Sequence, residues 1–118
     1  MGTEAEHRAK ADHNREFLKG ISDQFPDWLT TAAFYVAVQL VEMLLAKRAK
    51  HSADHHQRKE AVRRNFPRIT IAYNKLYNAS LVAKYDSPSK VLPADRVRLE
   101  LIDKALGDII KFAESPLR

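Results

Sequence analysis

The sequence contains no cysteine, which excludes disulfide bonds, zinc-thiolate sites and thiol catalysis, and suits the reducing cytosol. We therefore expect a cytoplasmic protein. Glycine and proline are scarce, at 3 and 5 of 118 residues. Alanine, leucine, lysine, arginine and glutamate are frequent instead, which favours helices over strands. Glycine-rich phosphate loops, dinucleotide-binding fingerprints and serine elbows are also missing, which excludes the enzyme classes built on those motifs.

The length of the chain suits a single domain, residues 1–118. An apolar fraction of 45% is enough for one compact core. Charges run throughout the first twenty residues, so we expect no secretory signal. The longest apolar stretch, Trp28 to Ala46, includes Gln39 and Glu42, which favours a helix buried in a bundle over a membrane span.

Capping residues and apolar spacing predict five helices. Thr3 with Glu6 forms a capping box at the first helix, and Asp54 with Gln57 can cap the third, short one. The predicted helices run from Thr3 to Gly20, from Asp27 to about Lys50, from Asp54 to about Asn65, from Pro67 to a loop at Asp86–Leu92, and from Pro93 onward. This order predicts an all-α fold, an up-and-down helical bundle of four main helices plus one short helix.

Spacings of three and four predict which side chains of the last two main helices face the core. The fourth helix should bury Ile69, Ala72, Leu76, Ala79 and Ala83, and the fifth should bury Leu99, Ile102, Leu106, Ile109 and Ala113. A second stripe on the fourth helix carries Tyr73, Tyr77, Ser80 and Lys84. Such tyrosines could stack bases, but packed rings with hydroxyls in water are the more common arrangement.

Polar residues on packing stripes are the most informative positions. On the second helix, Trp28, Ala32, Tyr35, Gln39, Glu42 and Ala46 share one face. A carboxylate on that face needs a partner, and Arg58 or another residue of the basic segment is the natural candidate. Glu42 then belongs either to an internal ion pair or dimer contact, or to a polar pocket with Tyr35 and Gln39. His7 and Asn14 lie on the stripe of the first helix, where a hydrogen-bonded core residue is the commoner role.

Positive charge is concentrated between Lys47 and Arg68. Eight Lys and Arg residues in this stretch face only Asp54 and Glu60, giving +6, whereas the whole chain carries +5. A patch of this kind attracts polyanions, although a solvated helix face has the same composition.

The same stretch holds His51, His55 and Arg58. His51 and His55 are four residues apart, but the capping signals interrupt the helix and no acid stands in register, so we expect no metal and no cofactor. His55 and Arg58 share a helical face. An imidazole beside a guanidinium can move a proton while the cation holds a phosphate, which is the minimum for RNA cleavage. A capping role at the helix start is the alternative.

The order of these residues resembles the HEPN superfamily of helical-bundle proteins. The resemblance covers residues 7 to 85 and is carried by His7…Asn14…Leu18, Asp27-Trp28…Phe34-Tyr35…Gln39…Glu42, His55…Arg58 and Tyr73…Leu76…Ser80…Lys84-Tyr85. It implies a bundle of four main helices plus a short one, often as a homodimer. Many members of the superfamily are ribonucleases of toxin–antitoxin, CRISPR or other defence systems, and others bind nucleotides or partner proteins.

Two functional hypotheses follow from the resemblance. In the first, the chain is an RNA- or nucleotide-directed protein that can act as a metal-independent ribonuclease of a toxin–antitoxin or defence system, with His55 and Arg58 as the catalytic pair. Its binding residues would be Asn14, Trp28, Tyr35, Gln39, Glu42, Arg48, His51 and Tyr85. In the second, it is a non-catalytic homodimer that binds a partner such as a nucleotidyltransferase.

Departures from the family pattern favour binding over catalysis. Active members carry an Arg followed by four to six residues and a His near the start of a late helix, whereas here such spacings occur only at Arg8–His13 and Arg48–His55. Gln39 stands where a His is common, and Lys84 stands where an Arg precedes the tyrosine.

Overall fold

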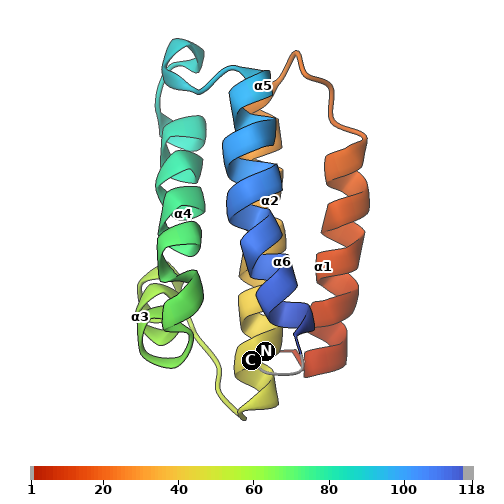
Figure 1. Cartoon of the computed structure of the whole chain (residues 1–118), viewed down its shortest axis with the longest axis vertical. Helices are drawn as coiled ribbons and strands as arrows, with labels where there is room; N and C mark the ends of the chain where they lie inside the picture. The colour runs from red at the N-terminus through yellow and green to blue at the C-terminus, as the bar shows by residue number, and fades with distance from the viewer. Residues whose placement is uncertain (1, 116–118) are drawn as a thin grey trace.

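The computed structural model describes residues 2–115 and contains helices but no strand within them. Four long antiparallel rods form the bundle (Figure 1). Three of them are α1 (Glu4–Lys19), α2 (Pro26–Lys47) and α4 (Thr70–Tyr85), and the short α3 (His55–Asn65) precedes α4. The fourth rod is continuous and consists of α5 (Ala94–Arg96), η3 (Val97–Leu106) and α6 (Gly107–Glu114). The predicted all-α bundle of four main helices and a short one is confirmed.

Helix α2 is the centre of the fold and contacts α1, α4 and the last rod. Its residues from Leu29 to Leu45 are buried except Tyr35 and Gln39. By length and composition α2 could also cross a membrane, but 83% of its most apolar window is buried inside the bundle. The sequence prediction of a buried central helix is therefore confirmed.

Two predicted helix starts are confirmed by their caps. The Thr3 hydroxyl accepts a hydrogen bond from the Glu6 backbone N–H at 3.1 Å, and the Glu6 carboxylate accepts from the Thr3 N–H, also at 3.1 Å. The Asp54 carboxylate accepts from the Gln57 N–H at 2.8 Å. These side chains satisfy N–H groups that the first turn of a helix leaves unpaired.

The predicted limits of α2 were wrong by a few residues. The helix begins at Pro26, after Phe25, and Asp27 lies in its first turn instead of capping it. Proline suits the first helical position because its ring fixes φ and its missing N–H is not needed there. The helix ends at Lys47 instead of Lys50, because Ala49 adopts a left-handed φ of 56°.

On α4, the predicted core face is only partly correct. Ile69 and Leu76 are buried, but Tyr73 and Ser80 are buried as well, whereas the predicted Ala72 is only half-buried. The expectation that the Tyr73 hydroxyl would be in water is therefore wrong. Helices α2 and α3 both pack on α4, and the Tyr73 ring lies against Phe34 of α2, with centroids 5.8 Å apart.

The predicted seam of the last rod is also shifted. Leu99 is 48% exposed and Ile102 half-buried, while Val97, Leu101 and Ala105 are buried. The cause is the winding of η3, which is a π-helix with hydrogen bonds from residue i to i+5. The wider turn moves the core-facing positions away from the regular α spacing.

Candidate functional site

The buried carboxylate of Glu42 is held by two donors from the segment after α2. Arg58 Nε donates to Glu42 Oε1 at 2.9 Å, and the Ser52 hydroxyl donates to the same oxygen. The side chains of Glu42 and Arg58 are 9% and 11% exposed. The internal ion pair that the sequence predicted is thus present, and it fixes the segment that carries Ser52, His55 and Arg58 against α2.

Arg58 also donates from Nη1 to Nδ1 of His55, at 2.8 Å. A guanidinium has no acceptor atom, so the imidazole must accept at Nδ1. A neutral His55 then carries its proton on Nε2. Because His55 is an exposed residue, although Phe34 and Tyr77 cover part of its ring, this N–H can donate to an anion, but it has no lone pair with which to act as a base.

Aromatic rings and cations surround His55 on three helices. Its ring centroid lies 5.6 Å from that of Phe34 on α2 and 5.9 Å from that of Tyr77 on α4. Lys84 Nζ lies 5.7 Å from the Phe34 centroid and 4.7 Å from the Tyr35 centroid. We call this set the His55 cluster; it comprises Phe34, Tyr35, His55, Arg58, Lys59, Tyr77 and Lys84.

Two lysines of the His55 cluster have no carboxylate partner within residues 2–115. Lys84 lies over Tyr35 and Phe34, and Lys59 Nζ lies 5.6 Å from the Tyr77 centroid. Both are therefore held by the faces of aromatic rings, an arrangement that leaves their charge uncompensated. The cluster is a positively charged surface.

Burial against these rings lowers the pKa of His55 below its usual 6.5, and the charges of Arg58 and Lys84 lower it further, while Asp54 opposes the change. The folded protein therefore holds His55 neutral at pH 7. Because the unfolded chain binds the proton first as the pH falls, the stability contribution of His55 is complete above about pH 6.5 and is lost as the pH falls through the lowered pKa.

We expect an NMR titration of the His55 ring to give a pKa below 6.5, assigned by the loss of the signal in His55→Gln. Lys84→Gln should raise this pKa, because it removes one of the charges that disfavour the imidazolium. Lys104→Gln, a matched loss of an exposed lysine on the last rod, should leave it unchanged. A His55 pKa that does not respond to Lys84→Gln would contradict the arrangement of the cluster.

The buried hydroxyl of Tyr73 lies beneath the cluster. Within the described part of the chain it has no hydrogen-bond partner. Burial raises the pKa of Tyr73, and the neighbouring positive charge of Arg58 opposes the rise. The phenol therefore stays protonated and serves as packing for Arg58.

The structure separates the predicted binding residues into groups. Glu42 joins His55 and Arg58, whereas Gln39 accepts a hydrogen bond at Oε1 from His7 Nδ1, 2.8 Å away, outside the cluster. His7 is thus the hydrogen-bonded residue that its sequence position predicted. Of the two alternatives for Glu42, the structure contains the ion pair and not a polar pocket shared with Tyr35 and Gln39, because Glu42 is buried with its two donors while Tyr35 faces outward at 43% exposure.

Arg48 and His51 do not reach the cluster. The Arg48 guanidinium lies 4.8 Å from the Phe66 ring centroid and donates to the Asn65 carbonyl oxygen at 3.4 Å. His51 is exposed in the turn before α3. Tyr85 is 80% exposed at the end of α4. These three residues are therefore surface positions that the structure does not bring to His55.

A separate apolar hollow lies between α1 and α2. It has a volume of about 190 Å³ and is lined by Asn14, Phe17, Trp28, Thr31, Ala32 and Tyr35. Three predicted binding residues, Asn14, Trp28 and Tyr35, thus meet here, away from Arg58. Tyr35 belongs to both places, since it lines the hollow and lies under Lys84.

Phe34, Lys59 and Phe17 are site residues that the sequence did not single out. In the sequence, Phe34 is one of many apolar residues of the second helix and indicates only a core position, which its full burial agrees with. Lys59 belongs to a general run of positive charge, and Phe17 has no feature in the sequence that distinguishes it from other apolar residues of the first helix. The one signal that could have indicated the cluster was the Tyr77–Lys84 stripe of the fourth helix.

No family model, curated protein or solved structure compared with this chain matches it. Among residues 2–115, no three His, Asp or Glu side chains gather in a way that could hold a metal ion.

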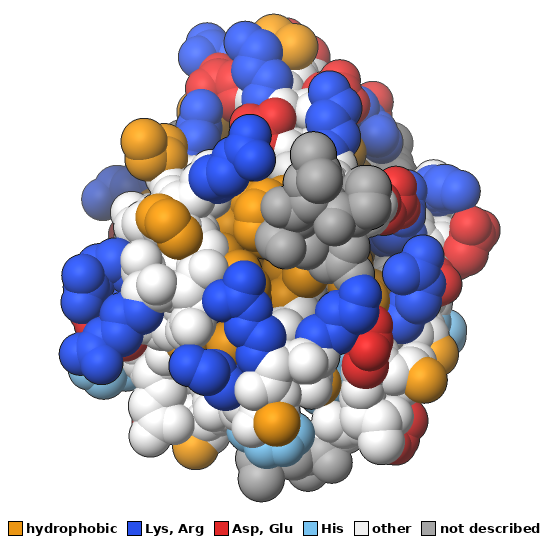
Figure 2. Space-filling model, turned by 60° about the horizontal axis from the view of Figure 1, so that its bottom comes forward, with side chains coloured by type: hydrophobic (Ala, Val, Ile, Leu, Met, Phe, Trp, Pro, Cys, Tyr) orange, Lys and Arg blue, Asp and Glu red, His pale blue; other side chains and the backbone are white. Residues whose placement is uncertain are grey.

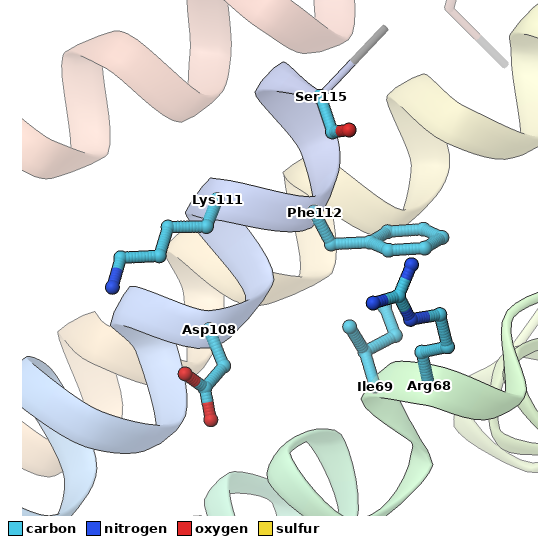
Figure 3. A pocket seen from close by; sticks show the side chains of 6 residues that line it. All are labelled: Arg68, Ile69, Asp108, Lys111, Phe112 and Ser115. Carbon is cyan, nitrogen blue, oxygen red and sulfur yellow. The ribbon is translucent and has the colours of Figure 1, made fainter. Parts of the chain in front are cut away.

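The end of the bundle where α2 finishes is strongly basic. Figure 2 shows Lys and Arg side chains around a hollow with hydrophobic side chains in it. A hollow of about 320 Å³ at this end is lined by Arg68, Ile69, Asp108, Lys111, Phe112 and Ser115 (Figure 3). The Asp108 carboxylate beside the two cations opposes binding of a phosphate there. In the His55 cluster Glu42 is buried against Arg58, and the nearest exposed carboxylate, Asp54, accepts the helix-capping hydrogen bond from the Gln57 N–H.

Proposed function

We propose that this protein is an RNA- or nucleotide-binding member of the HEPN-like bundles, and that it binds its ligand on the His55 cluster. The observation that carries the proposal is the set of rings and cations, Tyr35, Lys84, His55, Tyr77 and Lys59, that is arranged around the fully buried Phe34. Proteins that bind single strands combine cations along the backbone with aromatic side chains for the bases.

Charge supports the same ligand. Helix α3 begins at His55 and contains four of the eight Lys and Arg residues of the positively charged stretch. Arg63 and Arg64 on α3 share the single carboxylate of Glu60, which leaves one positive charge there, and the unpaired Lys59 and Lys84 add to it. A phosphate next to these lysines would also accept a hydrogen bond from His55 Nε2.

The orientation of His55 favours binding over cleavage. A ribonuclease of the type implied by the resemblance needs an imidazole that takes a proton from the 2′-hydroxyl. In the described geometry Nδ1 is occupied by Arg58 and Nε2 carries the proton. We therefore propose that His55 and Arg58 hold the ligand, and expect RNA to remain intact in the absence of metal.

The test is fluorescence anisotropy with a labelled single-stranded RNA at increasing salt. We expect the logarithm of affinity to fall linearly with that of salt, with a slope reduced by about 0.7 in Lys84→Gln and in Lys59→Gln. Lys104→Gln removes the same charge elsewhere and should keep the wild-type slope. Absence of binding at about 50 mM salt, or equal loss in all three variants, would exclude the His55 cluster as the interface.

The RNA recovered from the same samples tests cleavage. Intact RNA supports a binding protein. Metal-independent cleavage that is abolished in His55→Gln, with the helical circular dichroism retained, would instead assign His55 and Arg58 to catalysis. Retained cleavage in that variant would remove His55 from the mechanism.

A further inference from the structure

The hollow between α1 and α2 exposes three large aromatic side chains. Phe17 is 62% exposed, Trp28 59% and Tyr35 43%. They surround the buried Thr31 and Ala32, with Asn14 as the polar group of the lining. Exposed apolar side chains that form one contiguous patch often mark a binding site.

We propose that this hollow receives one base of a single-stranded RNA, stacked on Trp28 and Tyr35, while the adjoining phosphate lies at Lys84. The inference rests on the proposed function and adds to it a second subsite. This subsite recognises the ligand because it carries a base, whichever base that is. It places Asn14, Phe17 and Trp28 in the recognition of the ligand.

The size of the hollow fits one ring system. Its volume of about 190 Å³ is below the roughly 300–1,000 Å³ of pockets that enclose a whole ligand. Aromatic walls favour a flat π-system, because base–aromatic stacking is tolerant of base identity. The side-chain amide of Asn14 has no hydrogen-bond partner among residues 2–115, so it can donate to and accept from the edge of a base.

Continuity with the positive charge points to a nucleotide. Tyr35 lines the hollow, and Lys84 Nζ lies 4.7 Å from the centroid of the same ring. A base in the hollow therefore has a cation directly beside it, on the side that leads to His55. An apolar protein segment would gain nothing from this lysine, whereas a sugar-phosphate chain requires it.

The area of the patch argues against a second copy of the chain as the occupant. Aromatic side chains offer about 150–250 Å² each, so the exposed parts of the three rings amount to roughly 300–400 Å². A stable protein interface buries about 800 Å² on each partner. The rings alone supply less than half of that.

The experiment compares a six-nucleotide oligoadenylate with a hexamer of the same charge that lacks all bases. Trp28 is the single tryptophan of the chain, so its fluorescence reports directly on the hollow. We expect the oligoadenylate, but not the abasic hexamer, to quench it. Trp28→Ala should weaken binding of the oligoadenylate by about 5- to 150-fold, the equivalent of one lost stacking interaction, and leave the abasic hexamer and the salt slope unchanged.

Phe25→Ala is the matched control, because Phe25 is 51% exposed but lies outside the hollow. Trp28→Phe keeps a stacking ring and should restore most of the affinity. If both hexamers bind alike and the fluorescence of Trp28 is constant, the base subsite is wrong while the proposed function stands. If neither binds, the proposed function itself fails. If light scattering shows a dimer that Trp28→Ala dissociates without changing RNA affinity, the hollow is an interface between copies and the inference is overturned.

Discussion

Arg58→Ala is expected to destabilise the protein by about 3–5 kcal/mol, because it leaves the Glu42 carboxylate buried without its counter-charge. Both side chains are almost fully enclosed, and Arg58 Nε lies 2.9 Å from Glu42 Oε1. The loss would be measured as the change in the free energy of unfolding by urea denaturation followed by circular dichroism. Glu42→Ala should have a similar effect, since it strands the guanidinium instead.

Arg63→Ala provides the matched control for this pair. Arg63 bonds Glu60 at 2.9 Å, but the two side chains are 60% and 45% exposed, so water screens the attraction and the cost should be at most about 1 kcal/mol. The double variant Glu42→Leu with Arg58→Met should recover much of the lost stability, because no charge remains buried. Equal losses for Arg58→Ala and Arg63→Ala would contradict a buried ion pair.

Phe34→Ala should also cost about 3–5 kcal/mol, because it removes a fully buried ring and leaves a cavity. Phe34 contacts Tyr35, His55, Tyr73 and Tyr77, so few neighbours are free to fill the space. The measurement is again urea denaturation, with Phe25→Ala as the control for loss of a ring that is half in water.

A second readout distinguishes the role of Phe34 in the cluster from its role in the core. Burial is the main reason that the pKa of His55 is low, so removing the ring should let water reach the imidazole and raise that pKa. An unchanged His55 pKa in a folded Phe34→Ala variant would mean that Phe34 contributes packing only.

Local signals were enough to predict the helices and one part of the site. Thr3 and Asp54 were recognised as caps because a helix start depends on a few neighbouring residues. The apolar residues around every side of α2 required a central position. Glu42 on that helix required a partner, and Arg58, one of the candidates within the nearby basic stretch, is the one that the structure contains.

Contacts between distant segments could not be predicted. Phe34, His55 and Lys84 meet because α2, α3 and α4 pack together, and no local spacing encodes that meeting. Arg48 is close to His55 in sequence, yet its guanidinium lies over Phe66 instead of joining the cluster. Membership of the HEPN superfamily stays a prediction, because the resemblance depends on function-bearing residues and not on the helical pattern.

The buried face of Tyr73 was missed because tyrosine suits both a core and a wet surface. The packing of α2 and α3 on α4 decides between them. The core-facing positions of the last rod were also missed in part. The apolar spacing from Leu99 to Ala113 is compatible with α-helical winding, but the segment Val97–Leu106 is a π-helix in the packed protein.

The π-helical winding of η3 makes the last rod tolerant of the deletion of a residue. In a regular helix such as α2, deletion of one residue turns every later side chain by about 100° and would remove the whole buried stripe from the core. In η3 the loss of one residue can be absorbed, because a turn of i to i+5 bonding can tighten to i to i+4 while Ile109 and Ala113 keep facing inward. The last rod is therefore the place in this bundle where a shorter sequence can preserve the same architecture.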